Sequence, residues 1–443
     1  MDDAVPDTPP VPFVGSEIGP LREVIVHRPG AELERLTPAT MDELLWDDLL
    51  WVSRAQDEHD AFVGVLEDAG VLVHQLPDLL TQTLAVPEAR AHVLNATFTR
   101  EHLGPSLAPA LLAHADSLDD AELAGVLVAG LTGREVADRL GGVDTLPLHV
   151  RGPEALILGP LPNHLFTRDA SCWVYDGVAV NSMRYAARVR ESVHYEAIYR
   201  WHPRFAELRL GGTADETGPG PGEVSSAVGT GRPAGRGFHR WAAGPAEGAA
   251  NVEGGDVLVV GGGAVVVGMS ERTTPQGVEH LAARMFAAGS ADRVLALAMP
   301  SQRELMHLDT AMTMVDERTF LLYGGLGDLP SFTLTPDGAG DVTVTDHAPE
   351  RMQAVLAEIV GHDDLRFLTP DLDARTAARE QWDDGCNALA LAPGVAVTYD
   401  RAPASNAHLR ANGIEVIEVP GGELGRGRGG PRCMSCPVVR EAR

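Results

Sequence analysis

The segment DVLVVGGGAVVVG, residues 256–268, sets the plan of the fold. Two apolar runs flank three glycines, which predicts two strands joined by a tight turn. Residues 278–288 then have the spacing of an amphipathic helix, and residues 293–297 (RVLAL) resume a strand. A glycine-rich loop that cradles phosphate opens into a helix. These glycines lead into a second strand instead, so the segment predicts a hairpin and not a nucleotide site.

The same order of strand, turn, strand, helix and strand recurs along the chain. Residues 387–420 repeat it as NALALAPGVAVTYD, ASNAHLRANG and IEVIEV, and weaker copies occupy residues 24–27 with a helix at 51–70, residues 172–182 and residues 310–323. About five copies of one unit predict an α/β protein of pseudo-symmetric ββαβ modules arranged around a central site. The periodicity predicts the repeat but does not by itself supply the ring.

Three segments depart from this plan. Residues 78–140 are rich in Ala and Leu at helical spacing, which predicts an inserted helical bundle. Residues 211–248 are crowded with Gly, Pro, Ser and Thr, so we expect a flexible loop insertion there. The N-terminal residues 1–14 should be disordered, which leaves residues 15–443 as a single catalytic domain.

The charge of the chain excludes some partners. Of 443 residues, 63 are Asp or Glu and 35 are Lys or Arg, so the formal net charge is −28. Such a chain repels phosphate backbones and anionic lipid, and we expect neither a nucleic-acid nor a membrane partner. No segment approaches the ~20 consecutive apolar residues of a membrane helix, and the N-terminus MDDAVPDTPPVP does not resemble an export signal. We therefore expect a cytoplasmic protein.

The four cysteines are Cys172, Cys386, Cys433 and Cys436. They are too few for a disulfide scaffold of this size and fit a reducing compartment. Cys433 and Cys436 form a CxxC pair that could in principle be a redox centre or half of a zinc site. However, there is no second CxxC, and this one lies about ten residues from the end of the chain rather than near an early βαβ unit.

The segment GRGRGGPRC, residues 425–433, joins a flexible backbone to a thiol. Its four glycines allow close approach to a ligand, and Arg426, Arg428 and Arg432 surround Cys433. Neighbouring positive charge lowers the pKa of a thiol, so we expect a reactive thiolate. The alternative is a basic, glycine-rich tail that happens to contain a cysteine.

Upstream polar residues add candidates for acid–base chemistry. In MHLDT, residues 306–310, a strand would place His307 and Asp309 on one face and Leu308 on the other. Such a pair can exchange protons or bind a cation, although it can equally form a hydrogen bond within a core. Glu253 and Asp256 flank a Gly-Gly turn, where ordinary turn chemistry is the alternative.

Together these motifs resemble one family, the arginine deiminases of the guanidino-group-modifying superfamily. The resemblance runs from SEIGPLREVIVHRPG at residue 16 to residue 437, and includes LTP (36–38), DELLWDD (42–48), PNHLFTRD (162–169), MRYAAR (183–188), EGGD (253–256), MHLDT (306–310), WDDGCNALALAPGV (382–395) and RGRGGPRCMS (426–435). The shared order of so many motifs makes the resemblance specific. It implies a five-bladed pseudo-symmetric α/β propeller, the pentein fold, with the inserted helical bundle.

The resemblance also implies catalytic roles for five residues. Asp169 and Asp309 match a pair of aspartates that holds the planar guanidinium. Glu253 matches a glutamate that contacts the guanidinium and orients the histidine, and His307 matches the histidine that shuttles protons. Cys433 matches the nucleophile, which forms a covalent amidino-cysteine before water releases citrulline.

Further residues match positions that bind the rest of the substrate, L-arginine. Arg188 and Arg272 match residues that grip the α-carboxylate, and Asn163 matches a contact to the α-amino end. Arg428 matches a mobile arginine that gates the site and pairs with the thiolate when substrate is absent. The expected substrate-binding set is Asn163, Phe166, Arg188, Arg272, Gly427 and Arg428. Cys436 replaces a methionine of many relatives, and we expect it to be structural.

Other functions remain open at this stage. A related guanidino enzyme, such as a dimethylarginine hydrolase or an amidinotransferase, would use the same nucleophile, and a non-catalytic arginine-binding or redox protein would use Cys433 only structurally. The resemblance implies no cofactor and no metal. We also expect a homo-oligomer, either a dimer or a tetramer.

Overall fold

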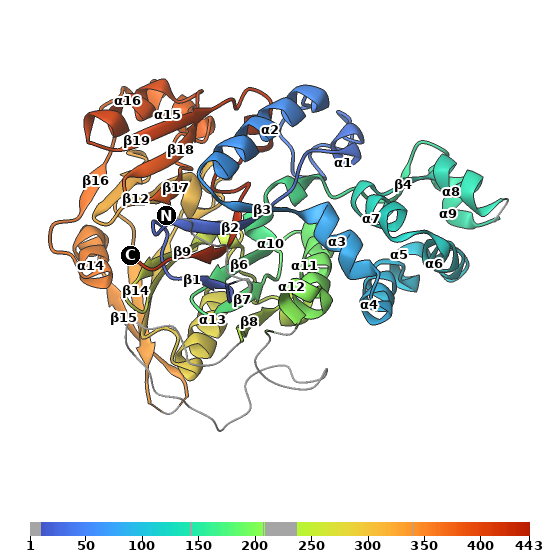
Figure 1. The fold of residues 1–443 in the computed structure, drawn as a ribbon, viewed down its shortest axis with the longest axis horizontal. Coiled ribbons are helices and arrows are strands. Elements are labelled where there is room, and N and C mark those ends of the chain that lie inside the picture. The colour runs from blue at the N-terminus through green and yellow to red at the C-terminus, as the bar shows by residue number, and fades with distance from the viewer. Residues whose placement is uncertain (1–9, 142–143, 207, 209–236, 339) are drawn as a thin grey trace, which may run out of the picture.

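Five three-stranded units make up the α/β body of the computed structural model, which describes residues 10–141, 144–206, 208, 237–338 and 340–443 (Figure 1). In every unit the first strand is antiparallel to the second, and the second is parallel to the third. The units are β6 (Ser171–Val174), β7 (Gly177–Val180) and β8 (His239–Ala243); β9 (Val257–Gly261), β10 (Ala264–Met269) and β11 (Arg293–Ala298); β12 (Met312–Asp316), β13 (Thr319–Leu322) and β16 (Arg366–Leu368); β17 (Leu389–Ala392), β18 (Val395–Tyr399) and β19 (Glu415–Val419); and β20 (Cys436–Arg440), β2 (Leu21–Val26) and β3 (Leu72–Gln75). The mixed α/β class and the repeat predicted from the sequence are therefore confirmed.

The fifth unit combines the two ends of the chain. The C-terminal strand β20 is antiparallel to β2, with Ile25 opposite Cys436, and the short strand β1 (Phe13–Val14) pairs with its other edge. The sequence pattern at residues 24–27 lacked a first strand because that strand comes from the far end of the chain. The expected disorder of residues 1–14 is wrong for Phe13–Val14, whose backbone joins the sheet, and residues 1–9 lie outside the described residues.

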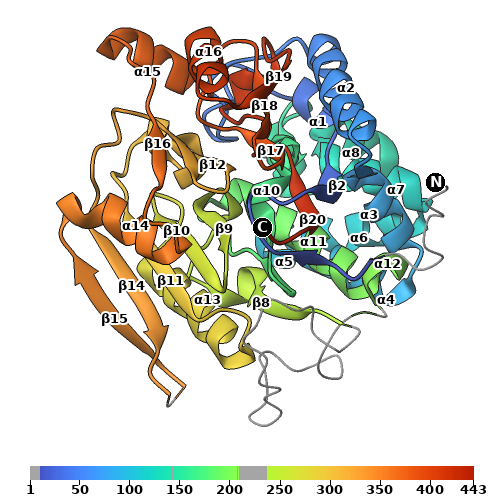
Figure 2. The ribbon, with the colours of Figure 1, turned by 60° about the vertical axis from the view of Figure 1, so that its left-hand side comes forward.

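Helices connect the second and third strands of the units. They are α2 (Val52–Asp68), α11 (Val189–Trp201), α13 (Pro275–Ala288), α14 (Met352–Val360) and α16 (Pro403–Ala411). Helix α13 starts where the Thr274 side chain accepts the N–H of Gly277, and it ends at Gly289, whose φ of 71° is the left-handed conformation that glycine adopts easily. Its buried face packs Val278, Leu281 and Met285 into the core. Figure 2 shows α2, α13, α14 and α16 outside the strands, with β9, β12, β17 and β20 towards the middle.

The first two strands of the second unit, β9 and β10, are almost fully buried, as the apolar runs at residues 256–268 predict. A hairpin that we did not predict, β14 (Ser331–Pro336) and β15 (Val342–His347), extends this sheet at the edge of β11. Its outer strand is largely exposed and rich in Thr, so its apolar pattern is weak.

A run of helices projects to one side of the body (Figure 1). It contains α3 (Leu76–Leu84), α4 (Pro87–Thr97), α5 (Arg100–Leu103), α6 (Leu107–Ser117), α7 (Asp120–Ala129), α8 (Gly133–Leu140) and α9 (Leu146–Arg151). Between α7 and α8 lies the two-residue strand β4 (Leu131–Thr132), which pairs with β5 (Leu156–Leu158). Helices α3 and α4 contact α11, which attaches this helical region to the first unit, that of β6, β7 and β8.

The predicted loop insertion at residues 211–248 ends too late. Residues 211–236 lie outside the described residues, but β8 (His239–Ala243) is a regular strand parallel to β7. Phe238 and Trp241 are buried there, and Trp241 donates its indole N–H to the carbonyl of Val174. These two aromatic side chains bury enough apolar surface to support a strand, although the segment as a whole is rich in glycine.

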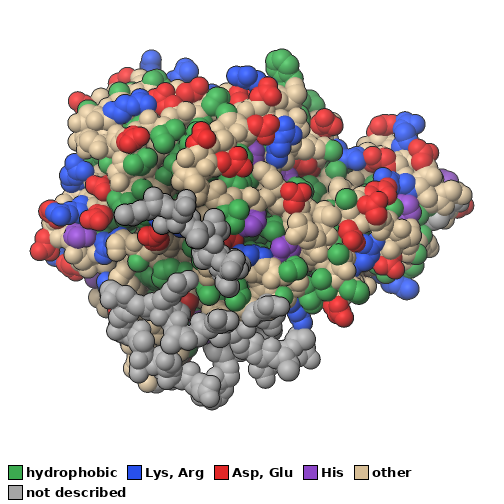
Figure 3. Space-filling model, viewed as in Figure 1, with side chains coloured by type: hydrophobic (Ala, Val, Ile, Leu, Met, Phe, Trp, Pro, Cys, Tyr) green, Lys and Arg blue, Asp and Glu red, His purple; other side chains and the backbone are tan. Residues whose placement is uncertain are grey.

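The surface carries both signs of charge. Figure 3 shows acidic and basic side chains interspersed on the visible face rather than separated into large patches. No helix within the described residues is long and apolar enough to cross a membrane.

Candidate active site

Polar side chains gather at one structural position that recurs in all five units, the turn just before the first strand. In chain order these residues are Asp169 before β6, Glu253 before β9, His307 and Asp309 before β12, Asn387 before β17, and Cys433 before β20. Each of them is buried. The repeat therefore places chemically different side chains at equivalent places, and their contacts join them into two groups, Asp169 with Glu253 and His307, and Asp309 with Asn387 and Cys433.

The turns that carry these residues are short and helical. They include α10 (Thr167–Ala170), the 3-10 turn η4 (Gly254–Asp256) and the 3-10 turn η6 (Leu308–Thr310); α10 packs against η4, and η4 against η6. The prediction that His307 and Asp309 share one face of a strand is wrong, because η6 precedes β12. The turn is held by Asp256, whose Oδ1 accepts the N–H of Leu308 at 2.9 Å.

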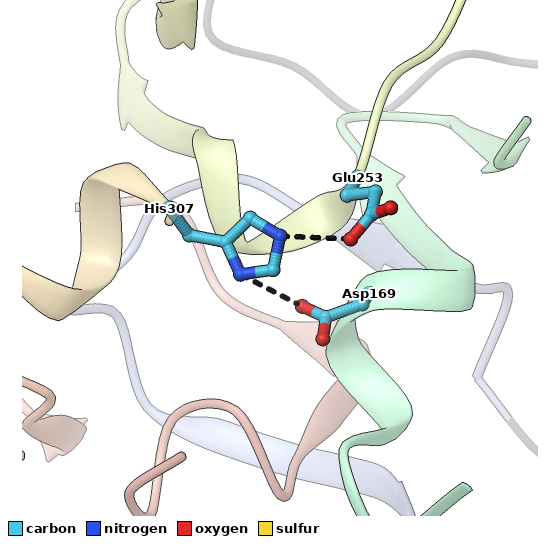
Figure 4. Close-up of side chains that lie close together, drawn as sticks. All are labelled: Asp169, Glu253 and His307. Carbon is cyan, nitrogen blue, oxygen red and sulfur yellow. Dashed lines mark hydrogen bonds and ion pairs between the residues drawn. The ribbon is translucent and has the colours of Figure 1, made fainter. Parts of the chain in front are cut away.

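His307 lies between two carboxylates (Figure 4). Its Nε2 is 2.9 Å from Oε2 of Glu253, and its Nδ1 is 3.7 Å from Oδ1 of Asp169. Gly255 lies against this pair, since a Cβ there would be 2.7 Å from Nδ1 of His307 and 3.0 Å from Oδ1 of Asp169. The second glycine of EGGD is thus required for close approach, beyond any role in the turn.

The charges of this group reinforce one another. Burial alone would lower the pKa of His307, but Asp169 and Glu253 outweigh it and raise that pKa to about 9. Burial would raise the pKa of Glu253, but Arg272, His307 and Arg188 together lower it to about 2. At neutral pH the structure therefore favours a protonated histidine beside an ionised glutamate, which is a proton donor ready for use.

Two arginines adjoin the same carboxylates. Arg188 is fully buried and donates to Oδ2 of Asp169 at 2.7 Å, to Glu191 at 2.8 Å and to the carbonyls of Asn163 and Phe166. Arg272 lies 3.4 Å from Glu253 and 2.9 Å from Glu271, with its guanidinium 4.6 Å from the ring centre of Tyr185. Arg188 is thus saturated by protein acceptors, whereas Arg272 has a looser arrangement.

The cluster of Asp169, Glu253 and His307 has a geometry that could hold a metal ion, because one ligand atom from each lies within 4.8 Å of the others. However, Nη1 of Arg188 is 2.7 Å from Asp169, and Nη1 of Arg272 is 3.4 Å from Glu253. Two fixed positive charges at these distances oppose a further cation that bears two charges.

Cys433 is held among three polar neighbours. Its Sγ lies 3.5 Å from Oδ2 of Asp309 and 3.1 Å from Nδ2 of Asn387. Arg432 donates to the same Oδ2 of Asp309 at 2.6 Å and forms a two-point ion pair with Glu17 at 3.0 and 3.2 Å. Burial would raise the pKa of Glu17, but Arg432 and Arg168 outweigh it and lower that pKa to about 2. The nucleophile candidate is therefore fixed to the sheet through its neighbour in the sequence.

The prediction that three arginines lower the pKa of the Cys433 thiol is wrong for the protein alone. Burial raises this pKa well above its ordinary value, and Asp309, Asp169 and Asp384 raise it further, while Arg432 only partly opposes them. The three arginines have other partners. Arg426 pairs with Asp48 and Glu423 near the surface. Arg428 stacks on Trp382, and Arg432 is bound to two carboxylates. The thiol is therefore neutral until another cation enters.

Two carboxylate oxygens of these groups make no hydrogen bond among the described residues, although one of them, Oδ1 of Asp169, lies 3.7 Å from Nδ1 of His307. Oδ1 of Asp169 and Oδ1 of Asp309 are buried and have no hydrogen-bond partner among the described residues. A buried carboxylate oxygen without a donor is costly, which marks both as places where a ligand with N–H groups gains most.

The comparison with known families decides the assignment. The model of the arginine deiminase family matches residues 42–219 and 232–440. The chain belongs to the arginine deiminase family. Solved structures with a similar fold include an amidinotransferase, SxtG, from Microseira wollei (13% identity, TM-score 0.52, covering 98% of this chain and 99% of that one). Another is the N-terminal domain of ArgZ, an arginine dihydrolase from cyanobacteria (12% identity, TM-score 0.50, covering 94% and 97%). At these identities the likeness shows only the fold, which is the mixed α/β fold of the pentein enzymes.

The remaining residues expected from the arginine deiminase resemblance lie around the tail. Phe166 stacks near Trp46, with ring centres 6.1 Å apart, and a Cβ at Gly427 would lie 2.7 Å from Phe166 and 2.6 Å from Trp46. Glycine at position 427 therefore lets the tail pass over these rings. The amide nitrogen of Asn163 donates to the carbonyl of Leu44 at 2.8 Å.

Arg428 does not pair with the thiolate here, contrary to the role implied by the resemblance. Its guanidinium lies 3.6 Å from the ring centre of Trp382, and its Nη1 donates to the carbonyl of Trp382 at 2.6 Å. Its φ of 65° lies in the left-handed region, which is uncommon for a residue with a side chain.

Sequence reasoning missed Asn387, Glu17 and Glu191, and it treated Arg432 only as a general positive charge. Asn387 falls within the quoted motif WDDGCN, and its position just before a first strand could have identified it. Glu191 lies three residues after Arg188 on a helix, which predicts a contact. Glu17 also lies in a quoted motif, SEIGPLREVIVHRPG, but no local pattern indicated its partner Arg432, which is 415 residues away.

Proposed function

We propose that this protein is an arginine deiminase that hydrolyses L-arginine to L-citrulline and ammonia through a covalent intermediate on Cys433. One observation carries the proposal: two buried aspartates, Asp169 and Asp309, each have a carboxylate oxygen without a donor in the region of the Cys433 thiol. A guanidinium offers planar N–H groups to both oxygens and presents its central carbon to the sulfur.

Substrate binding also activates the nucleophile. The carboxylates that keep the Cys433 thiol protonated are those that the guanidinium would neutralise. With the positive charge bound, the thiol releases its proton to solvent, and the thiolate forms only when its target is present. This order protects the site from other electrophiles while it is empty.

The reaction then has two halves. The Cys433 sulfur bonds to the guanidinium carbon, and the bond from that carbon to a terminal nitrogen breaks as His307 gives that nitrogen a proton, so that ammonia leaves. Neutral His307 next removes a proton from water, and the water oxygen bonds to the carbon. The carbon–sulfur bond then breaks, the hydroxyl proton of the adduct passes to the sulfur as the carbonyl forms, and citrulline departs from the restored Cys433 thiol and protonated His307.

For the other end of the substrate we propose that Arg272 and Arg188 bind the α-carboxylate, with Asn163, Phe166, Gly427 and Arg428 completing the site. Arg272 is supported by its looser contacts. Arg188 needs to exchange one of its present acceptors for the substrate, and until then it holds Asp169 in place.

We further propose that the five units close into a five-bladed propeller around this site. Support comes from packing between successive units: β20 against β6, α10 against η4, η4 against η6, and β12 against β17. A cytoplasmic location is supported by four buried cysteines that are all unpaired. The homo-oligomer, dimer or tetramer, stays a prediction that sedimentation of the purified protein would test.

The proposal is tested by incubating the purified protein with arginine, asymmetric dimethylarginine, or arginine plus glycine. We expect citrulline and ammonia from arginine alone, and an adduct on Cys433 in the intact mass after acid quenching. Cys433→Ala should give neither product nor adduct while remaining folded. Faster release of dimethylamine, or transfer of the amidino group to glycine, would replace the proposal with one of the related guanidino activities.

A further inference from the structure

Asn387 occupies the position in the fourth unit along the chain that the other units give to catalytic side chains. It stands two residues before β17, as Asp169 stands two residues before β6. Its side chain is 1% exposed, and both of its polar atoms form hydrogen bonds at or beside Cys433. Asn387 is therefore equivalent in position to the candidate catalytic residues of the other units.

The contacts of Asn387 fix its orientation. Its Oδ1 accepts the backbone N–H groups of Arg432 and Cys433, both at 3.1 Å. Because both partners are donors, this atom must be the oxygen, and the nitrogen must point the other way. Nδ2 donates to Sγ of Cys433 at 3.1 Å and to the backbone carbonyl of Asp309 at 3.1 Å.

The amide has little freedom to move. A Cβ at Gly430 would lie 2.8 Å from both Cβ and Oδ1 of Asn387, so the glycine-rich tail closes directly on it. The backbone N–H of Asn387 is also fixed, since it donates to the carbonyl of Asp384 at 2.9 Å. A donor held in this way needs no rearrangement when charge develops on the sulfur.

We propose that Asn387 is a catalytic residue of the deiminase reaction, donating its amide N–H to the Cys433 sulfur and stabilising the thiolate. The inference rests on the proposed function for its chemistry. A hydrogen bond to the charged form of a group favours that form, and here the neighbouring carboxylates of Asp309 and Asp169 act in the opposite sense. The amide also stabilises the sulfur as it leaves the amidino carbon, when the same charge returns.

The test compares Asn387→Ala and Asn387→Asp with the wild type. We expect kcat/KM for arginine to fall at least about a hundredfold in Asn387→Ala, as for loss of one preorganised donor. Part of the loss should be recovered as pH rises, because alkali can supply the thiolate that the amide no longer favours. Alkylation of Cys433 by iodoacetamide at a fixed pH should be about tenfold slower, the effect of one pKa unit. Asn387→Asp keeps the acceptor for the two backbone N–H groups and should be slower still.

Two controls separate catalysis from folding. Asn406→Ala removes another fully buried amide of the same unit, which bonds to Thr398 and the carbonyl of Tyr399 and does not touch the sulfur. It should lower stability without changing the pH profile. The affinity for arginine is measured in a Cys433→Ala background, where Asn387→Ala should change it little. The amide contacts the sulfur and not the carboxylate oxygens of Asp169 and Asp309.

An unaltered alkylation rate and pH profile in folded Asn387→Ala or Asn387→Asp would overturn the inference and leave a structural amide. The proposed function fails separately: if the wild type does not turn over arginine, the alkylation rates of the same variants still decide what Asn387 does to the sulfur. The two results are thus distinguishable.

Discussion

Replacing Asp309 by Asn should make Cys433 more reactive while abolishing turnover. Oδ2 of Asp309 lies 3.5 Å from Sγ, and both groups are buried. At an effective dielectric constant of about 20, one unit charge at this distance is worth roughly 4–5 kcal/mol, or up to about three pKa units. A nearby negative charge favours the protonated thiol, so its removal lowers the thiol pKa. Arg432, released from Asp309, would lower that pKa further.

The assay is the rate of Cys433 alkylation by iodoacetamide at pH 7 without arginine, followed by intact mass and peptide mapping. We expect Asp309→Asn to be alkylated at least about tenfold faster than the wild type, even if relaxation absorbs most of the Coulomb energy. The same variant should lose arginine turnover, because one of the two aspartates proposed to hold the guanidinium has lost its charge. Cys433→Ala in this background controls for alkylation elsewhere. Equal or slower alkylation in a folded Asp309→Asn protein would refute the electrostatic account of the neutral thiol.

Three further outcomes follow from the geometry. Gly255→Ala places a Cβ 2.7 Å from Nδ1 of His307. Citrulline formation should therefore fall at least about tenfold, with a small change in melting temperature. Normal activity would contradict the close approach of Gly255 to His307. The pKa of His307 near 9 predicts that kcat/KM falls as pH rises through about 9. Glu253→Gln removes one cause of the raised pKa and should move that decline to lower pH. An unmoved decline would assign it to another group. Glu17→Gln breaks the buried pair with Arg432 and should lower the free energy of unfolding by about 3–5 kcal/mol in urea titrations near pH 7. Because the folded pKa of Glu17 is about 2 against 4.5, this contribution exists above pH 4.5 and is lost as pH falls towards 2, so wild type and variant should converge in acid.

The sequence predicted the repeated unit well where both strands are buried and the turn between them is short. Residues 256–268 and 387–420 form the expected strands and helices because apolar content, turn glycines and helix spacing agree. The unit shared by the two chain ends was only half visible, since β20 pairs with β2 across more than 400 residues. No local pattern encodes a pairing of that kind.

The candidate site was predicted through motifs, but its electrostatics were not. Asp309 and Cys433 can be identified from the sequence. The charge around each of these groups, however, depends on which carboxylates the neighbouring arginines pair with in the folded protein. Arg432 adjoins Cys433 in the sequence, yet its guanidinium is directed to Glu17 and Asp309. Proximity along the chain therefore gave the wrong direction for the thiol pKa.

This charge arrangement bears on which molecules the site admits. A site with a neutral thiol and carboxylate oxygens without hydrogen bonds gains little from a neutral or anionic ligand, because neither kind of ligand relieves the repulsion that keeps the thiol protonated. In the proposed mechanism a planar cation binds the oxygens of Asp169 and Asp309 and also lowers the free energy of forming the thiolate, so the same interaction serves binding and activation. Methylation of the terminal guanidinium nitrogens removes N–H donors but leaves the charge. A bound methylarginine that leaves the sulfur accessible should therefore still accelerate the alkylation of Cys433. It should form fewer hydrogen bonds with the two aspartates than arginine does, and it should turn over more slowly.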